Sequence, residues 1–336
     1  MTPDVVRGAV GAVGRTPLIQ FEELSEFTKC RILGKAEFLN PGGSVKDRIA
    51  AALIADGEAT GRLVPGGEIV EATAGNTGIG LAMAAAARGY RTAFTVPAGL
   101  AAEKVAYLRL LGAEVIEAPD VPFSDERHFY HAAARLAAER GAFHADQFRN
   151  LANRDAHYRT TGPELWRQTG GEISALVAAA GTGGTLAGTG RYLKEQAAGI
   201  KVVLADPIGS ALYSYVKRGV LAADDHDYIA EGIGIGRLVP NFEGAPVDDA
   251  LQVTDRALVE TAYRVLRREG LLLGMSAALN VWAAARVALR LGPGHTVVTV
   301  LPDGGERYRS KLYDPAWLAA RDLTPRFPDL LGLLAL

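Results

Sequence analysis

The stretch Asn40-Pro41-Gly42-Gly43-Ser44-Val45-Lys46-Asp47-Arg48 predicts a turn that opens a helix. Asn-Pro and Gly-Gly pairs favour turns, Ser44 is a residue type preferred at helix N-caps, and Asp47 is spaced to return a capping hydrogen bond. Lys46 would lie in the first turn, where the helix dipole favours the neutral amine over the cation. A lysine in that setting is suited to act as a nucleophile and a base. Considered alone, a helix lysine such as Lys46 would more often be a solvated surface residue.

Composition limits the class of protein. The 336 residues allow about two domains, and the chain is 49% hydrophobic with a net charge of −2. The balanced charge, without a long basic run, argues against nucleic acid or an acidic membrane surface as a partner. The single cysteine, Cys30, excludes a disulfide framework and a cysteine-rich metal site. With no signal-peptide pattern at the start and no long apolar stretch, we expect a globular cytoplasmic protein without membrane contact.

Strand and helix patterns alternate along the chain. Short apolar runs predict strands over residues 31–38, 68–72, 92–96, 114–118, 175–180, 201–206 and 296–301. Helical patterns occupy residues 44–60, 77–88, 102–111, 124–140, 155–169, 185–196, 255–269 and 277–291. The alternation predicts an α/β fold of two domains, each an open twisted, mostly parallel sheet flanked by helices. Residues 207–250 are expected to form a loop, and the tail after Asp314 a packing or dimer-contact segment.

Two further polar turns each follow a predicted strand and open a helix. In such sheets, ligands bind at the carboxyl ends of strands, near helix N-termini. The first turn, Thr73-Ala74-Gly75-Asn76-Thr77-Gly78, offers N–H groups, hydroxyls and an amide that suit a carboxylate. The second, Gly181-Thr182-Gly183-Gly184-Thr185, predicts a phosphate cradle. Neither nucleotide-binding glycine motif is present, so a smaller phosphorylated ligand is favoured. Any one of these turns alone would more often be merely structural.

All three turns together, in this order and with a lysine in the first, resemble the pyridoxal-phosphate enzymes of the tryptophan synthase β-like fold (fold type II). The similarity is to the cysteine synthase and cystathionine β-synthase branch, in a bacterial cysteine-synthase-like form. Matching segments run nearly end to end: Gly14–Leu18, Asp146–Phe148, His157–Glu164, Glu231–Gly234 and Leu301–Tyr308.

The resemblance implies a role for each matching residue. Lys46 would hold pyridoxal 5'-phosphate as an internal aldimine and then move the α-proton of the substrate. Asn76 would bind the ring hydroxyl of the cofactor. The cofactor phosphate would be bound by Gly181, Thr182, Gly183, Gly184 and Thr185. The amino-acid substrate, and above all its carboxylate, would contact Thr73, Gly75, Asn76, Thr77, Gln147 and Gly232. No metal is implied.

The sequence departs from the family at two places. Ala74 stands where many members have a serine, which removes one possible substrate donor. Gly304 occupies the position where many members place the serine that meets the pyridine nitrogen. Ser276 is the better substitute, because an acid such as Asp303 facing that nitrogen would protonate it and alter the expected chemistry.

The resemblance implies β-replacement in cysteine biosynthesis, a transferase or lyase reaction. L-Cysteine would form from O-acetyl-L-serine and sulfide through an aminoacrylate intermediate. Cystathionine β-synthase activity and O-phosphoserine dependence stay open, the former because Glu231-Gly232 resembles that branch, although Ile235 replaces its tyrosine. A dehydratase is disfavoured because the loop at residues 74–78 lacks an Asn-His pair. A non-catalytic homologue is disfavoured because Lys46 is present.

The resemblance also implies how the chain is organised. We expect residues 40–155 to form a smaller domain with a mobile part, residues 87–122, that closes over substrate. Residues 1–39 and 156–336 would form the larger domain that binds the cofactor phosphate. A homodimer is implied, and a complex with serine acetyltransferase is left open.

Three other candidates carry less weight. His128 and His131 are spaced to share a metal on one helix, but a third ligand is not apparent. Asp224-Asp225-His226-Asp227 could bind a cation, although a solvated loop is the simpler interpretation. Cys30 is expected to be a packed thiol.

Overall fold

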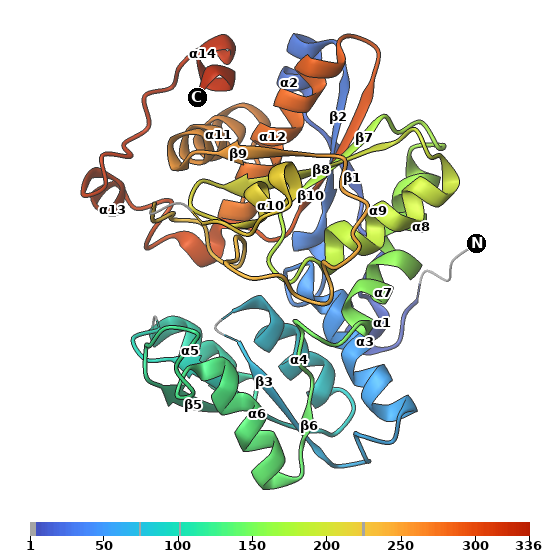
Figure 1. Cartoon of the computed structure of the whole chain (residues 1–336), viewed down its shortest axis with the longest axis vertical. Coiled ribbons are helices and arrows are strands. Elements are labelled where there is room, and N and C mark those ends of the chain that lie inside the picture. Colours follow the sequence, from blue (N-terminus) through green and yellow to red (C-terminus); the bar gives the residue numbers. More distant parts are fainter. Residues whose placement is uncertain (1–4, 74, 101, 224–225) are drawn as a thin grey trace. The chain divides into compact units, whose positions relative to one another are not determined.

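The computed structural model describes residues 5–73, 75–100, 102–223 and 226–336. The chain divides into two compact units (Figure 1). Unit 1 comprises Met1–Arg15 and Asn40–Ala156, and unit 2 comprises Thr16–Leu39 and His157–Leu336. The sequence-based division placed all of residues 1–39 with the C-terminal part, whereas the segment ending at Arg15 groups with unit 1.

Unit 1 is built on a four-stranded parallel sheet in the order β5-β4-β3-β6. The strands are β3 (Glu68–Ala72), β4 (Arg91–Pro97), β5 (Glu114–Ala118) and β6 (Phe143–His144). Its helices are α1 (Gly8–Gly11), α3 (Lys46–Ala59), α4 (Asn76–Ala86), α5 (Ala102–Leu110) and α6 (Phe129–Arg140), and α7 (Ala152–Arg159) runs across the boundary in sequence.

Helices cover both faces of this sheet. Successive residues of β3 point to opposite faces, so neighbouring residues pack against different helices. Ile69 packs with buried residues of α3 and α4, including Ile49 and Leu81. Its neighbour Val70 packs on the other face against alanines of α6, among them Ala133. Burial on both faces explains why the adjacent residues Ile69 and Val70 of this strand are both apolar.

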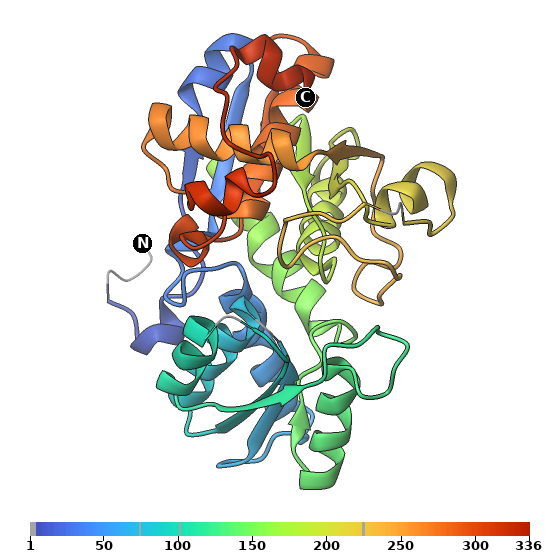
Figure 2. The same ribbon diagram turned by 90° about the vertical axis from the view of Figure 1, so that its left-hand side faces the viewer.

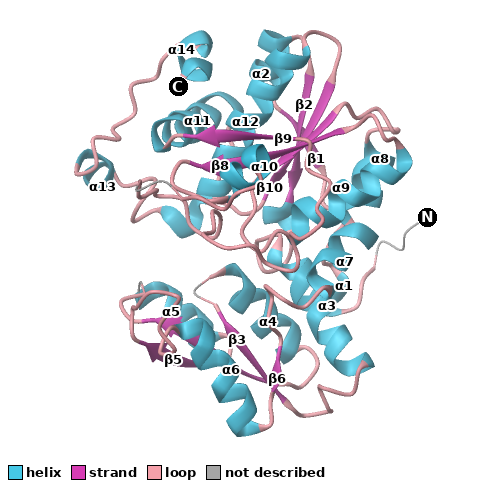
Figure 3. Ribbon diagram, viewed as in Figure 1, coloured by secondary structure: helices cyan, strands magenta, loops and turns pink. Residues whose placement is uncertain are grey.

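Unit 2 holds a six-stranded sheet in the order β1-β2-β10-β7-β8-β9, parallel except that β1 runs antiparallel to β2. Figure 3 draws the strands in magenta and the helices around them in cyan. The strands are β1 (Leu18–Gln20), β2 (Arg31–Ala36), β7 (Ala175–Ala178), β8 (Lys201–Pro207), β9 (Asp249–Val253) and β10 (Thr296–Leu301). The helices are α2 (Glu22–Thr28), α8 (Thr161–Gln168), α9 (Gly184–Gln196), α10 (Leu212–Arg218), α11 (Asp255–Glu269), α12 (Met275–Leu291), α13 (Pro315–Ala319) and α14 (Leu330–Ala335), with short 3-10 turns at Glu37–Leu39 and Gly305–Tyr308.

The core of unit 2 lies between its sheet and α12. Of the 17 residues of α12, 13 are buried, and Val177 and Val203 of the sheet belong to the same apolar cluster. A helix that is apolar almost all round is expected where it is enclosed by other elements. Since α11 and α14 also contact α12, this helix is buried between the sheet and an outer layer.

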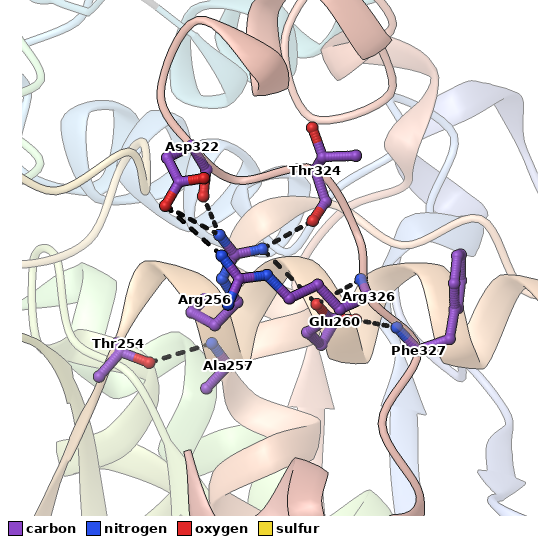
Figure 4. Close-up of polar contacts among 8 residues, drawn as sticks. All are labelled: Thr254, Arg256, Ala257, Glu260, Asp322, Thr324, Arg326 and Phe327. Atoms are coloured by element: carbon purple, nitrogen blue, oxygen red, sulfur yellow. Dashed lines mark hydrogen bonds and ion pairs between the residues drawn. The ribbon is translucent and has the colours of Figure 1, made fainter.

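The C-terminal segment, here residues 322–327, packs against α11 and is held there by hydrogen bonds (Figures 2 and 4). Arg256 donates hydrogen bonds to the carbonyl oxygens of Asp322 and Thr324. The buried carboxylate of Glu260 accepts the N–H groups of Arg326 and Phe327, at 2.7 and 2.9 Å. The prediction of a packing segment is therefore confirmed for its contacts within unit 2.

The α/β class and all seven predicted strands are confirmed, with three corrections to the helices and loops. The single helix predicted over residues 155–169 is wrong, because Thr160 leaves helical geometry (φ −125°) and separates α7 from α8. Residues 207–250 are not one loop, since they contain α10 and the first two residues of β9. The helix predicted from residue 124 begins at Phe129, where His128 accepts a capping hydrogen bond from the N–H of Tyr130.

Candidate functional site

The lysine turn is held by the side chain of Asn40. Its amide nitrogen donates to the carbonyl oxygen of Ser44 at 3.1 Å, and its oxygen accepts the N–H of Gly14 at 2.8 Å. Gly43 closes the turn with φ +77°, a left-handed conformation that favours glycine. Half-buried Lys46 then begins α3.

The prediction that Ser44 caps this helix is wrong in its register, because the N-cap position is Val45. Ser44 lies one residue earlier and accepts the N–H of Lys46 at 3.2 Å. The acid of the expected capping box, Asp47, accepts the N–H of Gly42 at 2.5 Å instead. A Cβ on Gly42 would lie within 3.0 Å of this carboxylate, so packing requires glycine at the first position of the Gly42-Gly43 pair.

The second turn and Gln147 come together at the carboxyl ends of two adjacent strands of unit 1. Thr73 follows β3, and its hydroxyl oxygen accepts the N–H groups of Gly75 and Gly78 at 3.3 and 3.2 Å. Thr77 in the first turn of α4 donates to Oε1 of Gln147 at 2.6 Å. Asn76 is the first residue of that helix. Ala74 lies outside the described residues.

Sequence reasoning missed Glu71, a buried acid whose side chain accepts a hydrogen bond from the backbone of Gln147. Glu71 is fully buried in β3, where Oε1 accepts the N–H of Ala72 at 3.0 Å and Oε2 that of Gln147 at 3.1 Å. Burial raises the pKa of Glu71 to about 8, although these two N–H donors act in the opposite direction. The available signal was an acid within an otherwise apolar strand, Ile69-Val70-Glu71-Ala72.

The glycine turn at residues 181–185 lies in unit 2, between β7 and α9. Gly183 has φ +82°, and a Cβ there would collide with Phe242. A Cβ on Gly181 would lie within 3.0 Å of the carbonyl oxygen of Gly232, so the 231–234 loop closes directly on this turn. Thr182 is buried, and Gly184 is the first residue of α9.

A buried histidine orients the last residue of the glycine turn. Nε2 of His157 lies 3.1 Å from Oγ1 of Thr185, and Nδ1 lies 2.9 Å from Oγ1 of Thr161. His157 was noted in the sequence only as part of a matching segment. Its two hydroxyl partners fix the ring, so the Thr185 side chain has a defined direction.

The loop that carries Gly232 is held at both ends. Glu231 forms an ion pair with Lys311, and the N–H of Ile235 donates to Oγ of Ser210 at 3.2 Å. Asp206, four residues before Ser210, accepts the N–H of Tyr213 at 2.7 Å, and burial raises the pKa of Asp206 to about 6.

A sequence profile of the family described as "Pyridoxal-phosphate dependent enzyme" matches residues 10–303. The chain belongs to this family. Its cofactor is pyridoxal 5'-phosphate. In this PLP enzyme the turns at Thr73 and Gly181 follow strands β3 and β7, one in each unit, whereas the lysine turn follows the 3-10 turn Glu37–Leu39.

Named relatives place this enzyme more narrowly. It is 49% identical to cysteine synthase 1 of Neurospora crassa over 97% of this chain and 88% of the relative, and 46% identical to cysteine synthase of Dictyostelium discoideum over 94% and 86%. The structure of an O-acetylserine-dependent cystathionine β-synthase from Helicobacter pylori superposes with a TM-score of 0.82 at 35% identity, covering 92% of this chain and 99% of that one. The expected bacterial branch is not supported, since the two curated relatives are fungal and amoebal.

The glycine turn fits the phosphate of this cofactor. Three of its five residues are glycines, two of which have no room for a side chain, and the turn leads into the N-terminus of α9, where backbone N–H groups and the helix dipole favour an anion. The half-buried amine of Lys46 at the start of α3 is of the type that forms a Schiff base.

Ser276 and Asp303 both lie near the N-terminus of α12. Ser276 is buried in its first turn. The carboxylate of Asp303 accepts the hydroxyl of Tyr308 at 2.7 Å and lies where a Cβ on Gly274 would collide with it. Gly304 pairs with Leu273 in an isolated bridge. Burial, reinforced by Asp303, raises the pKa of Tyr308 well above its usual value.

The remaining candidates have structural contacts. His131 Nε2 lies 2.7 Å from the carbonyl oxygen of Phe123, whereas His128 caps α6, so the pair does not share one orientation toward a metal. The candidate cation site Asp224-Asp225-His226-Asp227 is not fully described, because residues 224–225 lie outside the described residues. Cys30 is a packed thiol, as predicted, and donates to the carbonyl oxygen of Gly292 at 2.9 Å. No helix among the described residues is long and apolar enough to span a membrane.

Proposed function

We propose that this enzyme forms L-cysteine from O-acetyl-L-serine and sulfide by β-replacement in the cytoplasm. The observation that carries the proposal is near full-length identity of 49% to a cysteine synthase, in a chain that keeps all three family turns. The substrates are small molecules, and neither nucleic acid nor membrane is a partner. A homodimer is part of the proposal.

Each turn has its own task in this proposal. Bound pyridoxal phosphate withdraws electrons from the α-carbon of the substrate, which permits loss of the α-proton and of the β-acetate. Lys46 carries the cofactor and takes and returns the proton at Nζ. Gly181, Thr182, Gly183, Gly184 and Thr185 bind the phosphate, and Asn76 contacts the ring hydroxyl. The pyridine nitrogen is met by Ser276.

In this proposal, residues of unit 1 bind the substrate carboxylate. Thr73, Gly75, Thr77 and Gln147 offer hydroxyl, amide and N–H donors within one cluster of contacts, and Asn76 lies among them. Gly232 completes the substrate contacts. Residues 87–122 close over the substrate and exclude water, with 40–155 acting as the smaller domain.

The test is a cysteine assay combined with a visible spectrum. Purified protein should show a cofactor band that shifts when O-acetylserine is added without sulfide, and should release cysteine once sulfide is added. Lys46→Ala should lose both the anchored cofactor band and the product. Wild-type protein that binds cofactor but forms no cysteine from these substrates would refute the proposal.

Cystathionine β-synthase activity is the second candidate, favoured by Glu231-Gly232 and by the similarity to the Helicobacter pylori enzyme. Homocysteine in place of sulfide, with either O-acetylserine or serine, distinguishes the two. A higher kcat/KM for homocysteine than for sulfide would make cystathionine the product. O-Phosphoserine in the same assay tests the remaining donor.

A further inference from the structure

The buried acid Glu71 occupies the end of β3, where strand pairing stops. β6 pairs with β3 only at Ile69 and Val70, because β6 ends at His144. The chain then turns at Asp146, which has φ +47°. Ala72 would lie opposite Asp146 in the continued register, so its N–H has no strand partner on that side. The Glu71 carboxylate accepts that N–H in place of the strand.

The same carboxylate fixes the position of Gln147. Oε2 of Glu71 accepts the backbone N–H of Gln147 at 3.1 Å, while Asn153 donates to its carbonyl oxygen at 2.8 Å. The side-chain amide of Gln147 lies between Thr77, which donates to Oε1, and the carbonyl oxygen of Ala72, which accepts from Nε2 at 3.3 Å. Glu71 therefore links the end of β3 to two residues of the candidate carboxylate site.

We propose that Glu71 is a positioning residue for the substrate carboxylate. It holds Gln147 and, through it, the Thr77 hydroxyl in the arrangement that receives the carboxylate of the amino-acid substrate. The inference rests on the proposed function of this cluster and adds a residue that does not itself touch substrate. A carboxyl group suits this position because each of its two oxygens, in the ionised or the protonated form, can accept one of the two N–H donors that point at one buried spot.

The two N–H groups that Glu71 accepts explain why an acid stands beside the apolar residues of this strand. An aliphatic side chain at residue 71 would leave the N–H groups of Ala72 and Gln147 buried without acceptors, which is costly. An amide at the same position has one acceptor oxygen, so one of the two N–H groups would face an NH2 group instead. Glu71→Gln is therefore a nearly isosteric change that breaks one specific contact.

The test compares Glu71→Gln with Glu68→Gln, a matched control in the same strand. Among the described residues the Glu68 carboxylate has an ion pair only with Arg140, at 3.4 Å, and Glu114 also neutralises that arginine, so loss of the Glu68 charge should be silent. In Glu71→Gln we expect the KM for O-acetylserine to rise about tenfold or more, with kcat reduced less than about threefold, because ground-state and transition-state binding are weakened alike. The KM for sulfide and the cofactor content should stay within about twofold of wild type.

An equilibrium titration removes the dependence on turnover. Addition of L-serine or L-serinamide, followed by the visible spectrum of the holoenzyme, measures binding with and without the carboxylate. Glu71→Gln should weaken L-serine binding about tenfold and leave L-serinamide nearly unchanged. Glu71→Asp, which keeps two acceptor oxygens on a shorter arm, should lie between wild type and Glu71→Gln and serves if Glu71→Gln is recovered poorly.

The outcomes separate the inference from the proposed function. A wild-type enzyme that makes no cysteine but binds L-serine more tightly than L-serinamide would refute cysteine synthesis alone, and the Glu71 comparison would proceed by titration. Unchanged L-serine binding in folded Glu71→Gln would overturn the inference. So would an equal loss for serine, serinamide and cofactor, which would indicate a general structural role, or a wild-type enzyme with no preference for the carboxylate.

Discussion

Glu71 should make the stability of the protein depend on pH. Its pKa is about 8 in the folded protein and about 4.5 in the unfolded chain, so between these values the folded state holds an extra proton. The contribution of Glu71 to the free energy of unfolding therefore falls as pH rises from about 4.5 to about 8, by on the order of a few kcal/mol. The nearby Asp146 carboxylate acts in the same direction.

Urea denaturation of wild type and Glu71→Gln at pH 5, 6, 7, 8 and 9 measures this effect. The difference in unfolding free energy between the two should change in favour of Glu71→Gln up to about pH 8 and then level off. A difference that is constant with pH would show that Glu71 titrates alike in both states.

At the same scale, Gly181 should be intolerant of any side chain. A Cβ there would lie within 3.0 Å of the carbonyl oxygen of Gly232, so Gly181→Ala must displace the 231–234 loop or the glycine turn. We expect pyridoxal phosphate to be bound at least about tenfold more weakly, measured by cofactor release during dialysis. Gly199→Ala is the control, because nothing lies within 4 Å of its added Cβ. Equal cofactor retention by the two variants would contradict the assignment.

At the scale of elements, α11 depends on its N-cap. The hydroxyl oxygen of Thr254 accepts the N–H of Ala257 at 3.0 Å (Figure 4). Thr254→Ala should lower the unfolding free energy by about 1 kcal/mol, and Thr254→Ser should recover most of it. Denaturant unfolding measures both; similar losses for Ala and Ser would exclude the cap as the cause.

The success of sequence reasoning also differs between elements. The buried parallel strands were found because both faces are covered, which leaves a dense apolar run such as Ala175–Ala178. The edge strand β9 was missed because Asp249 and Gln252 interrupt its pattern beside an irregular segment. The break between α7 and α8 was missed because backbone geometry at Thr160, rather than a Gly or Pro, separates them.

In the candidate site, too, some residues were recognised from the sequence and others were not. The turns that hold Lys46 and Gly181 carry glycines and polar residues that are visible in one sequence. Glu71 and the His157 contacts were not recognised, because their meaning comes from partners distant along the chain, such as Gln147 and Thr185. Periodicity and spacing describe neighbours on one element, and these contacts join different elements.

At the scale of the whole molecule, the C-terminal segment should contribute to the stability of unit 2. Removal of the Glu260 carboxylate leaves two N–H groups, those of Arg326 and Phe327, without their acceptor (Figure 4). We expect Glu260→Ala to lower the unfolding free energy by about 2–3 kcal/mol and to speed protease cleavage between Asp322 and Phe327. Glu195→Ala, at a surface ion pair with Arg191, should cost less than about 1 kcal/mol. Equal effects of the two changes would argue against a fastening role for Glu260.

The enclosure of Cys30 bears on the chemistry of the medium in which this enzyme would work. The chain has one sulfhydryl group, and it is buried with its S–H directed at the carbonyl oxygen of Gly292. Thiol–disulfide exchange requires an accessible thiolate. Accumulating cysteine and its oxidised dimer, cystine, would therefore find no partner on the folded protein for a mixed disulfide. A cysteine introduced at an exposed position becomes the sole accessible thiol, so a fluorescent dye could be attached there without removing any native residue.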